Sequence, residues 1–482
     1  MNLRCSRFHG VFVVLLFALA APSGSVCRAS PGTLALTACE LPGVAGGVRC
    51  GTFEVAENPQ QPAGRHLRIA VAVLPATGGH ALADPIVPMM GGPGESAIES
   101  AEDFAKLFAT LRQDRDILLV DARGTGRSNA LKCDPFSDSE IAASLRDLFP
   151  ESAVGKCLHG LRQRADLTQY TYNTSANDLE QIRGALGTGQ LNLYSASYGT
   201  RAAQVYARMY PQSVRTIYMG SAVPIDVRNP LHFAKTGQAA LEKMLDACVA
   251  DSGCHGAFPQ IRAEFQQVAQ RLASGPVSVS LPELQHGALL YRGRVAEWFR
   301  SRLYRPYSST ELPWLIHRAW LGDWNPIAAG IADGARHFNS ELSFGLFLSI
   351  TCSEDVPFIT AADIAAQTSG TFLGDYRVRQ QQAACKHWPR TVLPAGYRQP
   401  VRSTIPTLFA SGDSDGGTPL WYAQAVAQGF ANRREVLLQG QGHTEWSDCI
   451  ARIYQEFVTS GSLGAERTTT CPPVPRPPFK TH

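Results

Sequence analysis

The segment of residues 191–200 contains a serine in a setting that suits a nucleophile. The pattern of this segment predicts a strand that runs into a helix through a tight turn, with Ser197 at the apex. Such a turn strains the backbone of the apical residue and leaves room only for small residues two positions before and after it, here Ser195 and Gly199. We therefore take Ser197 as the candidate nucleophile. Ser195 suits the role less well because its own flanking positions are Leu193 and Ser197, and an ordinary serine-rich turn is the remaining alternative.

A serine hydroxyl is a weak nucleophile unless a base takes its proton and a third group orients that base. Two later segments offer such groups, each directly after a predicted strand. The strand at residues 406–410 leads into a loop that carries Asp413 and Asp415, and the strand at 435–438 leads into a loop that carries His443. We take Asp415 as the candidate acid, with Asp413 as the alternative. His443 is the candidate base, with a surface or capping histidine as the alternative.

Acyl transfer through a serine also requires N–H donors that stabilise the developing oxyanion. Tyr198 follows the candidate nucleophile at the start of the predicted helix, so its amide is one candidate donor. Residues 90–94 read Met-Gly-Gly-Pro-Gly after an early predicted strand, and glycine allows the backbone to turn an N–H inward. We favour Gly92 as the second donor, with a plain loop as the alternative.

The elements that position these residues predict an α/β fold with a mostly parallel sheet, because short apolar runs end at glycine-rich loops and alternate with helical patterns. Strand patterns lie at residues 49–56, 66–74, 85–90, 117–120, 191–194, 216–219, 406–410 and 435–438. Helical patterns lie at 177–186, 200–209 and 446–458. The alternation stops at residues 225–344, which we predict to be a mainly helical cap inserted between two parts of the core, 30–224 and 345–482. The proline-rich tail from residue 472 has no pattern that assigns it to packed structure.

The N-terminus and the cysteines predict an exported protein. Arg4 and Arg7 precede an apolar run at 11–21, which is about half the ~20 residues that a membrane span needs, so we predict a signal peptide at residues 1–29 and no stable membrane insertion. The cleavage site, after Ala20 or Ala29, stays open. Ten of the 12 cysteines remain when Cys5 and Cys27 leave with the signal. They form near-neighbour pairs, and proximity alone predicts the bridges Cys39–Cys50, Cys133–Cys157, Cys248–Cys254, Cys352–Cys385 and Cys449–Cys471. A secreted or periplasmic location follows.

Composition excludes several other classes. The 482 residues carry 44 Lys and Arg against 41 Asp and Glu, a formal net charge of +3, and no basic run is interleaved with aromatic residues. Nucleic acid is therefore not an expected partner. No Cys-x-x-Cys or His-Glu-x-x-His spacing occurs, so we expect no metal site, and we expect no cofactor. The oligomeric state stays open.

Together these motifs resemble the proline iminopeptidase and tripeptidyl aminopeptidase branch of the α/β hydrolases. The resemblance covers most of the chain after the signal and is carried by residues 91–94, 121–128, 197–200, 412–419 and 442–443. Met90 stands where the family usually has histidine, and Ser195 where it usually has glycine. The spacing within 412–419 matches the family's acid motif at Asp415, which favours Asp415 over Asp413.

The resemblance implies an α/β-hydrolase fold and a serine exopeptidase that releases a residue or short peptide from a free N-terminus. It further implies a carboxylate that binds the substrate's α-amino group. Residues 349–355 resemble the segment after the cap in secreted members, so Glu354 is the candidate, with a structural salt bridge or a solvated carboxylate as the alternative. Arg123 and Arg127 lie in a family motif, and we expect them to brace loops rather than to contact substrate.

Two other functions remain open. A secreted carboxylesterase would use the same triad and oxyanion donors on a small ester, and an amine-binding acid near the cap distinguishes a peptidase from it. A binding protein without activity would keep only the fold, which the intact set of Ser197, Asp415 and His443 argues against.

Overall fold

The computed structural model describes residues 34–133, 141–282, 284 and 286–482. The predicted signal peptide at residues 1–29 lies outside the described residues and stays a prediction.

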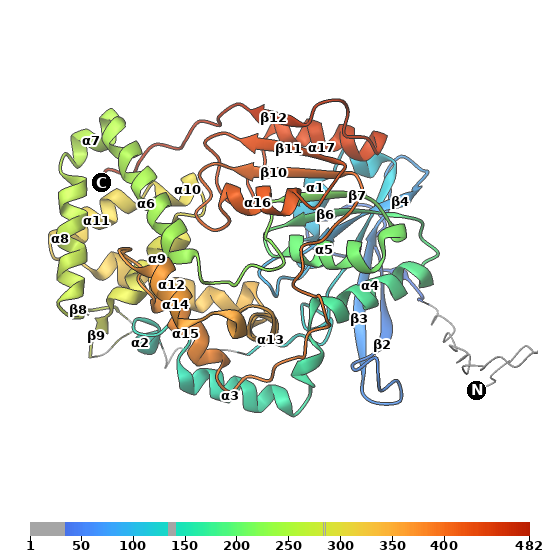
Figure 1. The fold of residues 1–482 in the computed structure, drawn as a ribbon, viewed down its shortest axis with the longest axis horizontal. Helices are drawn as coiled ribbons and strands as arrows, with labels where there is room; N and C mark the ends of the chain where they lie inside the picture. Colours follow the sequence, from blue (N-terminus) through green and yellow to red (C-terminus); the bar gives the residue numbers. More distant parts are fainter. Residues whose placement is uncertain (1–33, 134–140, 283, 285) are drawn as a thin grey trace, which may run out of the picture. The chain divides into compact units, whose positions relative to one another are not determined.

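A ten-stranded sheet is the centre of the fold, with the strand order β1-β2-β3-β5-β4-β6-β7-β10-β11-β12 (Figure 1). Neighbouring strands from β5 to β12 are parallel, while β1, β2 and β3 add to the edge in antiparallel fashion. The mostly parallel α/β sheet that the sequence predicts is therefore confirmed. The strands are β1 (Thr37–Ala38), β2 (Arg49–Ala56), β3 (His66–Leu74), β4 (Leu82–Met89), β5 (Arg115–Val120), β6 (Leu191–Ala196), β7 (Val214–Gly220), β10 (Thr407–Gly412), β11 (Arg433–Leu438) and β12 (Thr468–Cys471).

Both faces of this sheet are covered, which explains why its strands read as nearly continuous apolar runs. Successive side chains of a strand point to opposite faces. In β5, Leu118 packs in one core cluster, whereas Ile117 and Leu119 pack in another. The first cluster lies under α4 (Tyr172–Ala185), α5 (Gly199–Met209) and α16 (Leu420–Ala427), and Figure 1 shows these helices along one face of the sheet. The second cluster contains side chains of α1 (Ala101–Leu107) and α17 (Asp448–Ser460).

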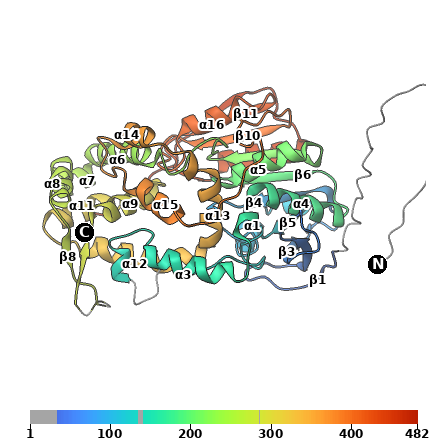
Figure 2. The same cartoon turned by 60° about the horizontal axis from the view of Figure 1, so that its bottom comes forward.

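Helices replace the β/α alternation between β7 and β10. Most of them bury apolar side chains in a core cluster separate from the two that flank the sheet, and Figures 1 and 2 both show α6, α7, α8, α9 and α11 gathered beyond one end of the strands. The elements of this region are α6 (Phe233–Ala250), α7 (Ser252–Ala257), α8 (Ile261–Ala273), β8 (Val277–Val279), β9 (Ala288–Leu290), α9 (Arg292–Arg302), α10 (Pro306–Ser309), α11 (Leu312–Trp320), α12 (Asn325–Glu341), α13 (Phe344–Glu354), α14 (Ala361–Thr368) and α15 (Tyr376–Cys385). The remaining helices are α2 (Ile141–Ser144) and α3 (Glu151–Arg162).

The predicted cap boundary at residue 344 stays a prediction. Helix α13 begins at Phe344, and its side chains Phe344, Leu346 and Ile350 belong to the core beside the sheet. By contrast, α14 and α15 still precede β10 in the chain. The helical region between β7 and β10 therefore extends past the predicted end of the cap.

Five disulfides join the ten described cysteines, and all five predicted pairs are confirmed. Cys449–Cys471 links α17 to β12, a strand that the sequence patterns did not predict. The tail after this bridge is partly packed, because Phe479 is buried in the core of the helical region and the Lys480 amide donates to the Thr310 carbonyl at 3.1 Å. The C-terminal segment thus contributes to the core although its sequence shows no periodic pattern.

Candidate active site

Ser197 occupies the turn between β6 and α5, at the carboxyl end of the sheet's central strands. Its φ of 53° lies in the left-handed region, which non-glycine residues seldom adopt, so the backbone is strained as the sequence predicts. A Cβ at Gly199 would come within 2.0 Å of the Met89 carbonyl oxygen, which explains the small residue two positions after Ser197. Ser195 is buried, and its hydroxyl donates to the Tyr218 carbonyl at 2.5 Å, away from any histidine.

The structure brings Ser197, His443 and Asp415 together from three separate loops. His443 Nε2 lies 2.9 Å from Ser197 Oγ, and His443 Nδ1 lies 2.8 Å from Asp415 Oδ2. Nucleophile, base and orienting acid are thus within hydrogen-bond reach of one another in the order that serine hydrolysis requires.

Asp415 is held as a carboxylate by its surroundings. Burial acts to raise its pKa, but His443 and the hydrogen bonds of Thr418 outweigh burial and lower the pKa. Thr418 Oγ1 donates to Oδ2 at 2.6 Å and Ser221 Oγ donates to the same oxygen at 2.9 Å, while Oδ1 accepts from the amides of Gly417 and Thr418 at 2.7 and 2.8 Å. An acid that stays ionised can stabilise the imidazolium that forms when His443 takes a proton.

The alternative acid, Asp413, lies elsewhere. Its Oδ1 accepts from the Gly440 amide at 2.9 Å and from the Ser414 hydroxyl at 3.0 Å. It therefore links the loop after β10 to the loop after β11 rather than contacting the histidine.

The loop that carries His443 is held by the segment between α9 and α10. The His443 amide donates to the Tyr304 carbonyl at 2.7 Å, and the two rings lie 5.0 Å apart between centroids. Arg305 Nε donates to the His443 carbonyl at 3.0 Å. A Cβ at Gly442 would lie 2.4 Å from the Tyr304 carbonyl oxygen, so this close approach requires glycine. The helical region thus positions the candidate base directly.

The two candidate oxyanion donors border the same space as Ser197. Gly92 and Tyr198 both line the cavity that contains the serine, and within the described part of the chain neither amide has a hydrogen-bond partner. The neighbouring Gly91 amide, by contrast, donates to Glu95 Oε2 at 3.1 Å. Gly92 has a φ of 101°, a conformation that favours glycine. This geometry is compatible with the predicted donor role, which stays a prediction.

A cavity of about 690 Å³ opens at Ser197 and His443. This volume lies in the range of small-molecule and cofactor sites, ~300–1,000 Å³. Its wall combines the glycine-rich loop, represented by Gly92, with apolar side chains such as Phe233 and Phe347 of the helical region. Among the described residues, two carboxylates lie in its wall, those of Glu95 and Glu297.

Glu354, the carboxylate expected to bind the substrate's amine, is not brought to this cavity. It is fully buried and absent from the cavity wall. Its Oε2 accepts from the Tyr397 hydroxyl at 2.5 Å and lies 3.6 Å from the Arg201 guanidinium, which also pairs with Asp355 at 2.8 Å. Asp355 in turn accepts from the Tyr198 hydroxyl at 2.8 Å. The surroundings of Glu354 therefore correspond to the structural salt bridge that the sequence left as the alternative.

The 121–128 motif braces loops, as expected. Arg123 is fully buried and binds both carboxylate oxygens of Asp178 at 2.7 Å. Asp121 accepts from the Ser96 hydroxyl at 2.6 Å and from the Arg127 amide at 2.9 Å, which ties this motif to the segment after the glycine-rich loop. The motif thus supports the loop that carries Gly92.

Sequence reasoning did not find three contributors to the site. Ser221, one residue past β7, and Thr418 both bind the acid, and Tyr304 holds the base. Thr418 was visible as part of the 412–419 motif, and Ser221 only as a polar residue after a predicted strand. No local pattern distinguishes Tyr304, because its role depends on a contact with a segment about 140 residues later in the chain.

Two family models match parts of this chain. Residues 84–247 match the family model described as alpha/beta hydrolase fold, and residues 370–471 match the model described as TAP-like protein. The tripeptidyl aminopeptidase of Streptomyces lividans is 23% identical over 471 residues, which cover 89% of this chain and 85% of that protein. The serine protease Hip1 of Mycobacterium tuberculosis is 32% identical over 230 residues, which cover 44% of this chain.

The match to Hip1 spans only 43% of the length of that protein. Among solved structures, the proline iminopeptidase of Mycobacterium smegmatis aligns with 86% of this chain and 100% of its own at 15% identity and a TM-score of 0.42.

No helix within the described ranges is long and apolar enough to cross a membrane. In the same ranges, no group of three or more His, Cys, Asp and Glu side chains is placed to hold a metal ion.

Proposed function

The chain belongs to the α/β-hydrolase family and has a TAP-like C-terminal part, and from this premise we propose that it is a serine peptidase that removes a residue or short peptide from free N-termini. The contact of Ser197, His443 and Asp415 beside a cavity that Ser197 and His443 line is the observation that carries this proposal. The names of the full-length and partial relatives, an aminopeptidase and a serine protease, favour peptides over esters as substrates.

The proposed reaction follows from the distances. His443 Nε2, 2.9 Å from Ser197 Oγ, takes the hydroxyl proton as Oγ attacks the scissile carbonyl, and ionised Asp415 stabilises the resulting imidazolium. The carbonyl oxygen becomes an oxyanion, which the amides of Gly92 and Tyr198 stabilise. His443 then gives its proton to the leaving amine, and the peptide bond breaks to leave an ester on Ser197. A water, deprotonated by His443, hydrolyses this ester and regenerates the hydroxyl.

An aminopeptidase also needs a carboxylate for the substrate's ammonium group, because a charge that leaves water for a cleft requires a partner. Of the two carboxylates that the described residues place in the cavity wall, Glu297 already receives two hydrogen bonds from Arg300, at 2.6 and 2.9 Å, and lies 3.3 Å from Arg377. Its charge is therefore balanced by guanidinium groups that would repel an ammonium group. We assign the amine to Glu95 instead, which lies beside Ser197: a Cβ at Gly91 would lie 3.4 Å from Glu95 Oε2 and 3.5 Å from Ser197 Cβ.

Export is part of the same proposal. Five disulfides persist in oxidising compartments and are rare in the cytosol, so they support the secreted or periplasmic location that the N-terminal sequence predicts.

Substrate profiling tests the proposal. Purified protein is assayed on aminoacyl and tripeptidyl chromogenic substrates with free or acetylated N-termini, and on a simple neutral ester. We expect cleavage of the free-amine peptides and at least ~10-fold lower kcat/KM on their acetylated forms, since 1.4 kcal/mol corresponds to a factor of ten. Glu95→Gln should reduce this preference while retaining ester hydrolysis. Efficient cleavage of acetylated peptides, or of the ester alone, would reject the aminopeptidase in favour of an endopeptidase or an esterase.

A further inference from the structure

One part of the cavity wall contains more positive than negative charge. Helix α9 contributes Arg294, Glu297 and Arg300 at a spacing of three residues, which places them on neighbouring positions of one helix surface. Helix α15 adds Arg377 and Gln381. All five line the cavity, and each is at most 7% exposed. Among the described residues of this part of the wall, three guanidinium groups therefore share one carboxylate in a site largely removed from water, and Asp147 acts on Arg294 from outside the wall.

Only Arg300 among these arginines is fully committed to protein partners. Its Nε and Nη2 donate to both oxygens of Glu297, and its Nη1 donates to the Tyr304 hydroxyl at 2.7 Å. Arg377 donates through Nη1 to Gln381 Oε1 at 2.7 Å, but its buried Nε has no hydrogen-bond partner among the residues that the structure describes, although Glu297 Oε1 lies 3.3 Å away. Arg294 donates through Nε to the Ser144 carbonyl at 2.5 Å, and among the described residues its terminal nitrogens have no hydrogen-bond partner.

This imbalance of charge is unfavourable for the folded protein. Burying a charge is costly unless the charge is paired and hydrogen-bonded. Burial is the main cause that lowers the pKa of Arg294 and of Arg377, and the nearby Arg300 lowers that of Arg377 further. Guanidinium groups with free donors in such a site bind carboxylates through short charge-assisted hydrogen bonds.

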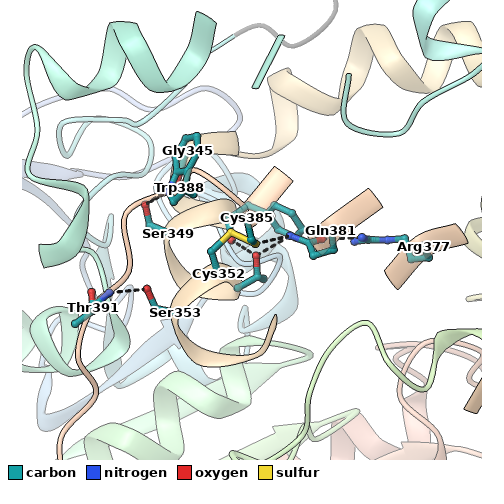
Figure 3. Close-up of a disulfide and its surroundings, with 11 residues drawn as sticks. Gly345, Ser349, Cys352, Ser353, Arg377, Gln381, Cys385, Trp388 and Thr391 are labelled. Carbon is teal, nitrogen blue, oxygen red and sulfur yellow. Dashed lines mark hydrogen bonds between the residues drawn. A yellow bond between two sulfur atoms is a disulfide. The ribbon is translucent and has the colours of Figure 1, made fainter. Parts of the chain in front are cut away.

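Arg377 is held in place before any ligand binds. Figure 3 shows Gln381 between the Cys352–Cys385 disulfide and Arg377. Gln381 Nε2 donates to Thr351 Oγ1 at 2.9 Å while its oxygen accepts from Arg377, so α13 and α15 fix the guanidinium jointly. The same guanidinium lies 5.1 Å from the ring centroid of Phe149. A donor that is already oriented loses little conformational entropy on binding.

The cluster lies close to the candidate catalytic residues. Tyr304 lies between His443 and Arg300. Its ring packs on His443 with 5.0 Å between centroids, and its hydroxyl accepts a hydrogen bond from Arg300. One tyrosine side chain therefore separates the histidine from the arginine cluster. A substrate bound at Ser197 can reach the cluster with a neighbouring side chain or with its terminus.

We propose that Arg294 and Arg377 form a carboxylate-binding subsite that selects acidic peptide substrates. This inference rests on the proposed peptidase function and names its substrate class. The carboxylate belongs either to an acidic side chain near the scissile bond or to the free C-terminus of a short peptide, and both present the same chemistry to the guanidinium groups.

Matched peptides test the subsite and distinguish the two sources. One pair has a free N-terminus, a C-terminal amide and either Glu or Gln on the N-terminal side of the scissile bond. A second pair is neutral and ends in a free or an amidated C-terminus. We expect kcat/KM to be at least ~10-fold higher for the carboxylate member of one pair, the range of one hydrogen bond to a charged group. The pair that responds identifies the source. Ratios near one in both pairs, with the peptides cleaved, overturn the subsite and leave the peptidase proposal standing.

Variants assign the effect to the arginines. Arg377→Gln and Arg294→Gln should each lower the preference of the responding pair by at least ~10-fold. Arg379→Gln is the matched control, because Arg379 lies on the same helix as Arg377 but is exposed and outside the cavity wall. An undiminished preference in both folded cavity variants would overturn the assignment.

A second assay requires neither a variant nor peptide cleavage. Glutarate and its diamide are compared as inhibitors of the hydrolysis of a neutral ester by the intact protein. We expect glutarate to inhibit at a concentration at least ~10-fold lower than glutaramide does. If no peptide is cleaved, the peptidase proposal fails and this comparison alone decides the subsite: equal inhibition by the two compounds, or none by either, overturns it.

Discussion

Tyr304 packs its ring against His443, with 5.0 Å between the centroids, and accepts the His443 amide on its own carbonyl at 2.7 Å. The candidate base is thus positioned by a residue from the helical region rather than by the sheet alone. A change in the helices that bound the cavity can therefore alter the candidate catalytic residues without touching Ser197.

Tyr304→Ala tests this positioning. The backbone hydrogen bond to His443 remains, but the ring contact, worth about 0.5–1.5 kcal/mol, is lost and the imidazole is less restrained. We expect kcat to fall about tenfold with a smaller change in KM, and the rate of labelling by a fluorophosphonate probe to fall in parallel. Tyr304→Phe keeps the ring and should lose less. A change in KM alone would show that Tyr304 contacts substrate instead of positioning the base.

Ser197→Ala and Ser195→Ala separate the two serines of the turn. Ser197→Ala should abolish labelling by a fluorophosphonate probe and lower turnover at least ~1000-fold, because it removes the only hydroxyl within reach of His443 Nε2 among the described residues. Ser195→Ala should keep the label and lower the free energy of unfolding by about 1 kcal/mol, because it removes the hydrogen bond to the Tyr218 carbonyl. Labelling that persists in Ser197→Ala and disappears in Ser195→Ala would refute the assignment.

Thr418→Val removes the hydroxyl that donates to the candidate acid, Asp415, while preserving the shape of the side chain. Thr418 Oγ1 donates to Asp415 Oδ2 at 2.6 Å and contributes to the lowered pKa of Asp415. We expect a loss of stability of about 1.5–3 kcal/mol, the range for a hydrogen bond to a charged group. A carboxyl with a lowered pKa stabilises the fold above its unfolded pKa and loses that contribution as the pH falls through its folded pKa. The deficit of Thr418→Val should therefore be largest near neutral pH and shrink in acid, as measured by urea unfolding at several pH values.

Activity provides the second measurement on Thr418→Val. Turnover should also fall, because Asp415 is less well held to stabilise the imidazolium. Thr310→Val, at a threonine outside the cavity wall, controls for the substitution. A deficit in stability that does not change with pH would show that Thr418 does not act through the Asp415 carboxylate.

The sequence predicted the parts of the fold that depend on local pattern. The strands at 49–56 and 66–74 match the structure residue for residue, and the turn at Ser197 has the small neighbours that its strained φ requires. Short apolar runs and glycine-rich loops are local signals, so they are visible without a structure. The same holds for the disulfides, whose partners are near neighbours along the chain.

Features that depend on contacts between distant segments were not predictable. Glu354 sits in a segment that resembles a known motif, but its surroundings are formed by Tyr172, Arg201 and Tyr397, which lie on other elements. No periodicity in residues 349–355 reveals that all four meet in a buried cluster. The sequence patterns missed strand β12 for a related reason. The segment has only four residues, and it becomes a strand only by pairing with β11.

Glu354→Gln distinguishes a buried structural carboxyl from an amine-binding one through stability. Burial, opposed by Arg201 and Tyr397, raises the pKa of Glu354 from its ordinary value of 4.5 to about 7. Between these values the folded protein holds a proton that the unfolded chain has released, so stability contributed at this carboxyl is lost as the pH rises through the window. Glutamine cannot ionise. The free energy of unfolding of Glu354→Gln should therefore rise relative to that of the unmodified protein between pH 4.5 and 7, by up to about 3 kcal/mol at 1.36 kcal/mol for each pKa unit.

Glu354→Gln also separates the two roles through activity. Because Glu354 does not line the cavity, Glu354→Gln should change kcat/KM for free-amine peptides and for a neutral ester by equal factors. Glu95→Gln should change kcat/KM for the peptides alone. Urea unfolding at pH 5 and pH 7 measures the free energy of unfolding of Glu354→Gln relative to the unmodified protein. Glu151→Gln, at an exposed helical carboxylate, is the control for the loss of one charge. The ratio of kcat/KM for the free-amine peptide to kcat/KM for the neutral ester measures the selectivity of each variant. A selective loss on free-amine peptides of at least ~10-fold in Glu354→Gln, with no gain in relative stability at higher pH, would restore Glu354 as the amine-binding residue.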